Sequence, residues 1–223
     1  MQHFLLDPAD TNEKFNSVLD QSFQLWRDVF SFEIESRGGT FHPDAFWNAR
    51  IISVIKGEEG ILGLHIYNSH NIDNLSTQSH SYFQDLSENV LQAFRKNGIH
   101  SLMTMEYLLV NPQFRGKTGP FKISELILGL GAWVLRESPW DCAVGVARVD
   151  RGVNSSAAKI GMKELEDVTK NQTPCKIVYV EKTKTIDNPD PFVQRRINSL
   201  WADKTNASRW VVAKTGWAQP KAA

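Results

Sequence analysis

The segment over residues 107–133, YLLVNPQFRGKTGPFKISELILGLGAW, holds the residues best suited to chemistry. An apolar run leads into a loop with Arg115, Gly116, Lys117 and Gly119, and a helical apolar pattern follows. The free N–H groups and dipole at a helix N-terminus attract phosphate, glycine lets the backbone approach an anion, and arginine donates two hydrogen bonds to its oxygens. The segment therefore predicts a phosphate site, with an ordinary solvated turn as the alternative.

Two further polar residues are candidates for the same chemistry. Glu106 precedes the apolar run, where partial burial would raise the pKa of its carboxyl and suit it to work as a general base; the alternative is a side chain that points to solvent. Asn154 opens a short helical pattern, where it either bonds a ligand or caps the helix. The six histidines lack ligand spacing and Cys142 and Cys175 form no close pair, so the sequence predicts neither a metal site nor a disulfide framework.

The elements that must position these residues alternate between helix and strand patterns. Apolar spacing predicts helices over about 12–32, over a stretch from Phe83 to Gly98, over 120–137 and from residue 154. Alternating and β-branched runs predict a hairpin over 50–68 and strands over 101–112, 141–150 and 174–182. The strand over 101–112 is apolar nearly throughout, so we expect it to be central. The sequence thus predicts one α/β domain over 1–184 and a C-terminal appendage over 185–223 packed on it.

Composition excludes several classes of protein. The chain has 223 residues, of which 41% are hydrophobic, and this is enough for one globular core. Lys plus Arg total 25 and Asp plus Glu total 25, so the net charge is zero. Nonspecific binding to nucleic acid, which depends on clustered positive charge, therefore has little support. No apolar run approaches the roughly 20 residues of a membrane span, and the first residues lack the pattern of a signal peptide. We expect a cytoplasmic protein without a membrane span.

Two stretches resemble the GCN5-related N-acetyltransferase (GNAT) family. LLVNPQFRGK, at 108–117, is similar to the strand and loop that bind the pyrophosphate of coenzyme A, and RGVNSSAAKIGM, at 151–162, is similar to the helix that ends in Lys-x-Gly-Phe. The order of predicted elements also agrees over 12–181. The resemblance implies an α/β (α+β) acyl-CoA N-acyltransferase fold: a mixed, mostly antiparallel sheet with helices on both faces and two central parallel strands that splay to admit pantetheine.

The resemblance also implies site residues and an activity. An acyl group would pass from acetyl-CoA or another acyl-CoA to a small-molecule amine by direct attack, with Glu106 as the base and the Val110 N–H as the oxyanion donor. The donor-binding residues would be Leu108, Leu109, Val110, Arg115, Gly116, Lys117, Thr118, Gly119, Pro120 and Asn154. The chain departs from the family at Thr118 and Pro120, where small residues are usual, and at Ala157, where many members have a tyrosine that protonates the leaving thiolate.

The sequence also allows other functions. LWRDVFSFE, at 25–33, and Asp44 resemble the start of the acyl-homoserine-lactone and N-acyl amino acid synthases, which use long acyl chains. The altered loop would suit acyl carrier protein, because that donor presents one phosphodiester and not a pyrophosphate. The departures at Thr118, Pro120 and Ala157 also allow a protein that binds a thioester without turnover. We expect a small amine or amino acid as acceptor, and not a protein. The balanced charge predicts no strongly charged surface on which a protein substrate would dock.

Overall fold

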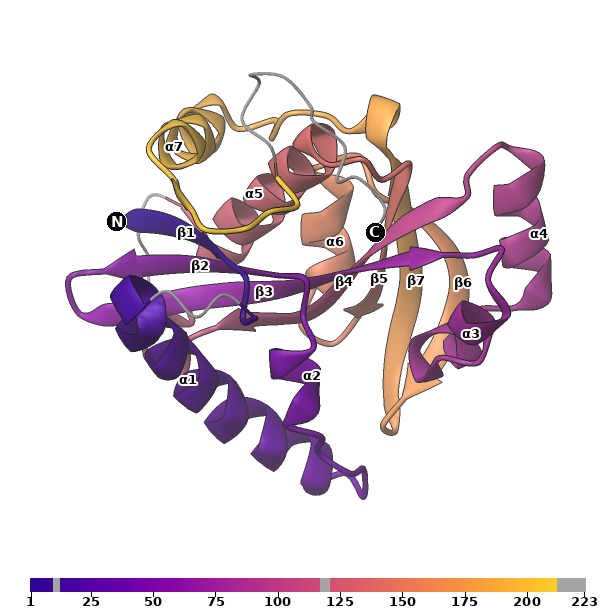
Figure 1. Cartoon of the computed structure of the whole chain (residues 1–223), viewed down its shortest axis with the longest axis horizontal. Helices are drawn as coiled ribbons and strands as arrows, with labels where there is room; N and C mark the ends of the chain where they lie inside the picture. Colours follow the sequence, from indigo (N-terminus) through magenta and orange to yellow (C-terminus); the bar gives the residue numbers. More distant parts are fainter. Residues whose placement is uncertain (10–12, 117–120, 212–223) are drawn as a thin grey trace.

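Within residues 1–9, 13–116 and 121–211, which the computed structural model describes, the chain forms one eight-stranded sheet (Figure 1). The strand order is β6-β7-β5-β4-β3-β2-β1-β8. The strands are β1 (Gln2–Leu6), β2 (Ile51–Gly57), β3 (Gly60–Asn71), β4 (Ser101–Val110), β5 (Cys142–Arg148), β6 (Lys163–Lys170), β7 (Thr173–Glu181) and β8 (Thr205–Asn206). Pairs β4–β5 and β1–β8 are parallel and the others antiparallel, which confirms the predicted mixed sheet.

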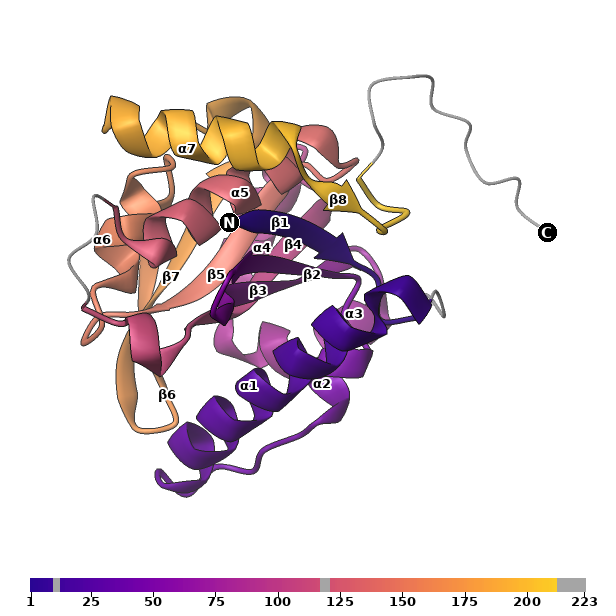
Figure 2. The ribbon, with the colours of Figure 1, turned by 90° about the vertical axis from the view of Figure 1, so that its left-hand side faces the viewer.

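Helices cover both faces of the sheet, with α1 and α2 on one side and α5 and α7 on the other (Figure 2). The helices are α1 (Asn16–Glu35), α2 (Asp44–Trp47), α3 (Leu75–Gln78), α4 (Glu88–Lys96), α5 (Ile123–Glu137), α6 (Val153–Ala158) and α7 (Pro191–Ala202), with 3-10 turns η1 (Glu13–Phe15), η2 (Ser81–Asp85), η3 (Pro112–Phe114) and η4 (Lys182–Lys184). Trp26 and Phe46 are fully buried between α1, α2 and the sheet. None of these helices is long and apolar enough to cross a membrane.

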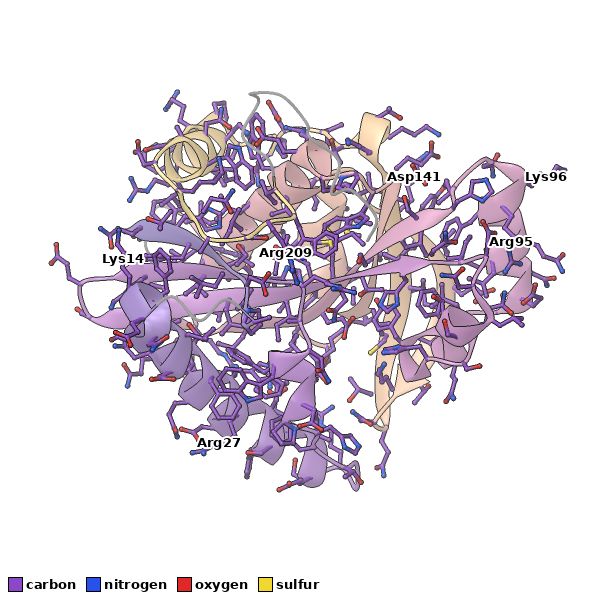
Figure 3. The ribbon with its side chains drawn as sticks, in the orientation of Figure 1. Lys14, Arg27, Arg95, Lys96, Asp141 and Arg209 are labelled. Carbon is purple, nitrogen blue, oxygen red and sulfur yellow. The ribbon has the colours of Figure 1, made fainter. Side chains whose placement is uncertain are left out.

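The two central strands are held together at their beginnings. Residues 102–105 of β4 pair with residues 142–145 of β5, and the described part of the chain shows no pairing between them beyond this point. Asp141, labelled in Figure 3, fastens the paired end, because its Oδ2 accepts hydrogen bonds from the N–H groups of His100 at 3.1 Å and Ser101 at 2.9 Å. Burial acts to raise the pKa of Asp141, but these hydrogen bonds outweigh it and lower the pKa. The strands are therefore free to splay at the other end, as expected.

A bulge on β4 lies at the start of the splayed part. The antiparallel register between β3 and β4 shifts where Tyr107 and Leu108 stand opposite His65. Tyr107 has a φ of +54°, in the left-handed region that residues with a side chain rarely adopt. A bulge bends a strand and re-aims its side chains, and bulges of this kind are frequent beside functional sites. The bulge therefore sets the direction of the β4 residues that follow it.

Some elements differ from the prediction. Strands β1 and β6 were not expected: β1 has five residues, and β6 is an edge strand whose charged side chains face solvent and give no apolar signal. Helix α4 begins at Glu88 and not near Phe83, because the Ser87 hydroxyl accepts from the Val90 N–H and caps it there. Helix α5 begins at Ile123, later than the expected residue 120.

Helix α7 and strand β8 pack against earlier parts of the chain. β8 pairs with β1, and α7 lies along α5 (Figure 2). Val193, Ile197, Leu200 and Trp201 of α7 belong to the same buried cluster as the apolar residues of α5. Gly129 on α5 allows the close approach, because a Cβ there would lie 2.3 Å from Ile197 Cδ1 and 2.9 Å from Cγ1.

Gly129→Ala is therefore expected to lower the free energy of unfolding by about 1–3 kcal/mol, because overpacking outweighs the gain in helix propensity. Chemical denaturation followed by circular dichroism measures this change. In the Gly129→Ala background, Ile197→Val removes the Cδ1 atom and should cost less than it does in the wild type. If the two substitutions lowered the free energy of unfolding in a strictly additive way, Ile197 of α7 would not pack against residue 129.

Candidate functional site

Two cavities share lining residues of β4 and β5 where these strands separate. The larger, of about 200 Å³, lies on the α1 face and is lined from α1, η2, β4, β5 and the β6–β7 hairpin. The smaller, of about 30 Å³, lies on the α5 face and is lined from β3, β4, β5, β7, α5 and α6; we call it the slot. Met105 and Val146 line both cavities. A ligand that passes between the splayed strands would therefore have one end in each cavity.

The predicted phosphate-binding part of the site lies at the C-terminal end of β4. Asn111 N–H donates to the Leu62 carbonyl on β3 at 2.9 Å. Successive peptide groups of a strand point to opposite edges, so the peptide groups of Val110 and Leu108 point away from β3 and toward the opening. The Val110 carbonyl accepts a hydrogen bond from Arg115 Nε at 2.9 Å. The Arg115 guanidinium is thus fixed at the rim of the opening, before the start of α5.

The structure describes part of the predicted phosphate-binding loop. Gly116 has a φ of +67°, and no described atom lies within 4 Å of the position of a Cβ, so the chain turns there in a conformation that favours glycine. The predicted residues Lys117, Thr118, Gly119 and Pro120 lie outside the described residues.

Two predicted donor-binding residues lie apart from the opening. The peptide groups of Leu109 face β3, where Leu109 stands opposite Leu64. Asn154 was expected at the start of its helix, but the residue that precedes α6 is Gly152 in the left-handed conformation. The Asn154 Nδ2 donates instead to Glu164 Oε1 at 3.0 Å, and Asn154 lines neither cavity.

Glu106 lines the larger cavity and is half-buried. Its Oε1 accepts a hydrogen bond from the fully buried Thr104 hydroxyl at 2.6 Å and another from Asn68 Nδ2 at 3.2 Å. Both partners are donors, so they fix the orientation of the side chain. No described residue donates to Oε2, which leaves this atom to accept a proton in the cavity. A carboxylate held in this way can accept a proton from a ligand in the cavity.

Tyr107 closes the cavity beside Glu106. Its ring packs edge-on against Trp26, with centroids 5.3 Å apart, and against Phe30, 5.0 Å apart. Burial and the neighbouring Glu106 charge raise the pKa of Tyr107 to about 12. The hydroxyl is therefore protonated near neutral pH, and the aromatic cluster keeps water from one side of the carboxylate.

Opposite charges line the rim of the larger cavity. Glu33 on α1 lies 2.8 Å from Arg148 Nη1 and 3.3 Å from Arg151 Nη2. Arg148 Nη2 lies 2.6 Å from Asp150, and this hydrogen bond raises the pKa of Arg148. Arg148 is therefore neutralised by two carboxylates of its own chain.

Arg37, which also lines the larger cavity, interacts at longer range with the Asp150 charge and forms no close ion pair among the described residues. It follows the end of α1, its guanidinium donates to the Thr173 hydroxyl, and its carbonyl accepts from Gln172 Nε2 at 3.2 Å. Among the described residues no carboxylate lies within ion-pair distance of it. Arg37 is thus tied to the β6–β7 hairpin while its charge stays available to an anion.

The described residues contain no group of three His, Cys, Asp or Glu that could hold a metal ion. Cys142 and Cys175 are buried free thiols. Among them, Cys175 lines the larger cavity, where burial raises the pKa of its thiol.

Glu106 and Arg37 line the larger cavity, and Leu108 and His65 line the slot. Of these four, Glu106 and Leu108 were predicted as site residues from the sequence. Arg37 follows a helix and His65 stands in a strand, so neither belongs to a motif. Arg37 could have been identified in the sequence as a basic residue next to Gly38 and Gly39, the two glycines that follow α1.

The chain has the acyl-CoA N-acyltransferase fold. No model of a protein family matches the sequence, and no curated protein matches it either. Solved structures do resemble it. A CoA-dependent acyl-homoserine lactone synthase, BjaI, solved with SAM and isopentyl-CoA, has a TM-score of 0.55 at 10% identity, over 93% of each chain.

Two other solved structures give the same result. FeeM, an N-acyl amino acid synthase from uncultured soil microbes, has a TM-score of 0.54 at 13% identity, over 82% of this chain and 92% of its own. An acyl-CoA N-acyltransferase from Pseudomonas aeruginosa has a TM-score of 0.51 at 11% identity, over 80% of this chain and 99% of its own. Both resemblances found in the sequence, to N-acetyltransferases and to the two classes of synthase, are thus present among the structural neighbours.

Proposed function

We propose that this protein is an N-acyltransferase that moves an acyl group from a CoA thioester to a small amine. The observation that carries the proposal is the opening between β4 and β5, with an apolar slot on one face and a cavity holding a carboxylate base on the other. The structural neighbours support the same general reaction, because they include an acyl-CoA N-acyltransferase and an N-acyl amino acid synthase.

The donor would enter from the α5 face. Pantetheine contains two amides, and the outward peptide groups of Leu108 and Val110 can pair with them as a further strand would. The phosphates would then lie at Arg115 and Gly116, before α5. The same N–H groups are oriented toward the thioester carbonyl, where they can stabilise an oxyanion; Val110 was the predicted donor, and Leu108 lies nearer the junction of the cavities.

The acceptor would enter from the α1 face, so its nitrogen meets the thioester at Met105 and Val146. Glu106 Oε2 takes one proton from the ammonium, and the neutral amine nitrogen then attacks the carbonyl carbon. The C–N bond forms as the C–S bond breaks, the sulfur leaves with the electron pair of that bond, and the second proton lost by nitrogen passes to solvent. An alkyl amine is mostly protonated at neutral pH, with a pKa of about 10.4 for lysine, so a fixed base is needed.

An amino acid is the acceptor that the cavity favours. Arg37 offers its guanidinium to a carboxylate, while Glu106 offers an acceptor to an amine. Phe30 and Ile34 supply an apolar wall for the side chain. A molecule with one amine, one carboxylate and an apolar group matches these three features.

Thermal unfolding with acetyl-CoA and octanoyl-CoA tests donor binding. A ligand at one hundred times its dissociation constant stabilises the folded state by about 2.7 kcal/mol, so a clear rise in melting temperature is expected. Arg115→Ala should reduce this rise. The matched control is Lys96→Ala, an exposed cation on α4 far along the sheet (Figure 3).

Release of free thiol over a panel of amines and amino acids then tests turnover. Stabilisation by a thioester without thiol release would support a binding protein, and preference for octanoyl-CoA would support the long-chain alternative. No stabilisation by either thioester would contradict the proposal.

A further inference from the structure

One polar side chain in the slot has no part in the reaction described above. His65 on β3 lines the slot and is 2% exposed. Among the described residues, its buried Nδ1 has no hydrogen-bond partner. The nearest aromatic ring is Tyr67, with centroids 4.9 Å apart.

An unpartnered imidazole in this place is costly. A buried donor or acceptor without a partner costs about 1–3 kcal/mol, and such groups are few in native proteins. The other side chains of the slot are apolar, among them Leu108, Leu128, Ala157 and Val178. Leucine at position 65 would occupy a similar volume without this cost. The imidazole therefore indicates a polar partner that arrives with a ligand.

The position of His65 selects which part of the ligand it meets. An acceptor in the larger cavity reaches the thioester carbon at the junction that Met105 and Val146 form. The sulfur is bonded to that carbon on the donor's side and so lies toward the slot. His65 lines the slot and does not line the larger cavity. The sulfur is thus the polar centre of the reaction nearest to its ring.

Resting on the function proposed above, we propose that His65 donates a hydrogen bond to the sulfur of the CoA thioester and stabilises the thiolate as the C–S bond breaks. Ala157, on another wall of the slot, has no hydroxyl that could do this. The proton balance of the reaction is unchanged, because the two protons lost by nitrogen still pass to Glu106 and to solvent. His65 supplies a hydrogen bond and does not transfer its proton.

The state of the ring agrees with this role. Burial lowers the pKa of His65 to about 3, so the imidazole is neutral in the working range of pH and has one N–H donor. The described groups packed around it in the slot are apolar, and its aromatic neighbour Tyr67 is a phenol whose pKa burial raises. No charged side chain of these elements lines the slot to compete for that donor.

The test compares CoA with desulfo-CoA, which lacks only the sulfur, on wild type and His65→Leu. At pH 9, where a substantial part of the thiol is ionised, the wild type should bind CoA about tenfold more tightly than desulfo-CoA by calorimetry. His65→Leu should bring the ratio close to one, lower kcat about tenfold and leave the acceptor KM unchanged. Free of ligand, the variant should melt at or above the wild-type temperature, because it has lost an unpartnered polar group.

His65→Gln restores an N–H donor and should recover part of the ratio, which also serves if the leucine variant does not fold. An equal CoA to desulfo-CoA ratio in wild type and both variants would overturn the inference and leave the proposed function intact. Absence of any CoA binding by the wild type would overturn the proposed function itself, so the two failures are distinguishable.

Discussion

Glu106→Gln is expected to lower kcat for N-acyl transfer about 100- to 10,000-fold, the range for loss of a positioned general base. Glutamine keeps the shape of the side chain and can still bond the Thr104 hydroxyl, so the fold should be unchanged. The amide cannot take the amine proton. Steady-state thiol release measures the loss, and the KM for acyl-CoA should stay near its wild-type value.

The pH profile separates a base from a merely structural carboxylate. Above about pH 8 a growing fraction of the amine is already deprotonated, so the deficit of Glu106→Gln should shrink as the pH approaches 10. Glu35→Gln, an exposed carboxylate on α1 outside both cavities, controls for loss of one negative charge. A deficit of the same size at every pH would remove Glu106 from the role of base.

The sequence was informative where one local segment carries the function. The apolar run of β4, the glycine that follows it and the apolar pattern of α5 are contiguous, so their order predicts the strand, the turn and the helix. Glu106 is adjacent to this run and was identified with it. The parallel central pair followed from the resemblance, and it is confirmed by the pairing of residues 102–105 with 142–145.

Other features depend on contacts between distant segments. The Arg37 guanidinium reaches the Thr173 hydroxyl across 136 positions of the chain, and no local pattern encodes that contact. His65 appears in the sequence as one polar residue of an apolar strand, and its lack of a partner becomes visible when its neighbours are known. The sequence did not predict β6, because an edge strand can expose charged side chains on both of its faces. The alternation of apolar and polar residues that indicates a strand is then absent.

In the proposed function, the splayed strands would give the two substrates separate routes. A donor on the α5 face and an acceptor on the α1 face would meet at Met105 and Val146, so neither would have to leave before the other binds. Direct attack needs both to be present together, and the reacting atoms must be held within about 3–3.5 Å. The bulge at Tyr107 serves this arrangement, because it orients Glu106 and Leu108 toward opposite faces of the sheet at the meeting point.

Acceptor selection by Arg37 gives the second large expected effect. Arg37→Met should raise the KM for an amino acid such as phenylalanine about 10- to 100-fold, because a charge-assisted hydrogen bond contributes about 1.5–3 kcal/mol. The KM for phenethylamine, which has the same side chain and amine without the carboxylate, should change little. The comparison of the two acceptors on one variant cancels any general effect on folding or donor binding.

Arg37→Lys retains the charge without the planar pair of donors, so it should recover part of the preference for phenylalanine. The carboxylate is the feature that the matched acceptors do not share. If Arg37→Met raised the KM of phenylalanine and phenethylamine by the same factor, Arg37 would act by tying α1 to the β6–β7 hairpin and not by binding the acceptor. The amino acid preference would then have to rest on another cation of the cavity.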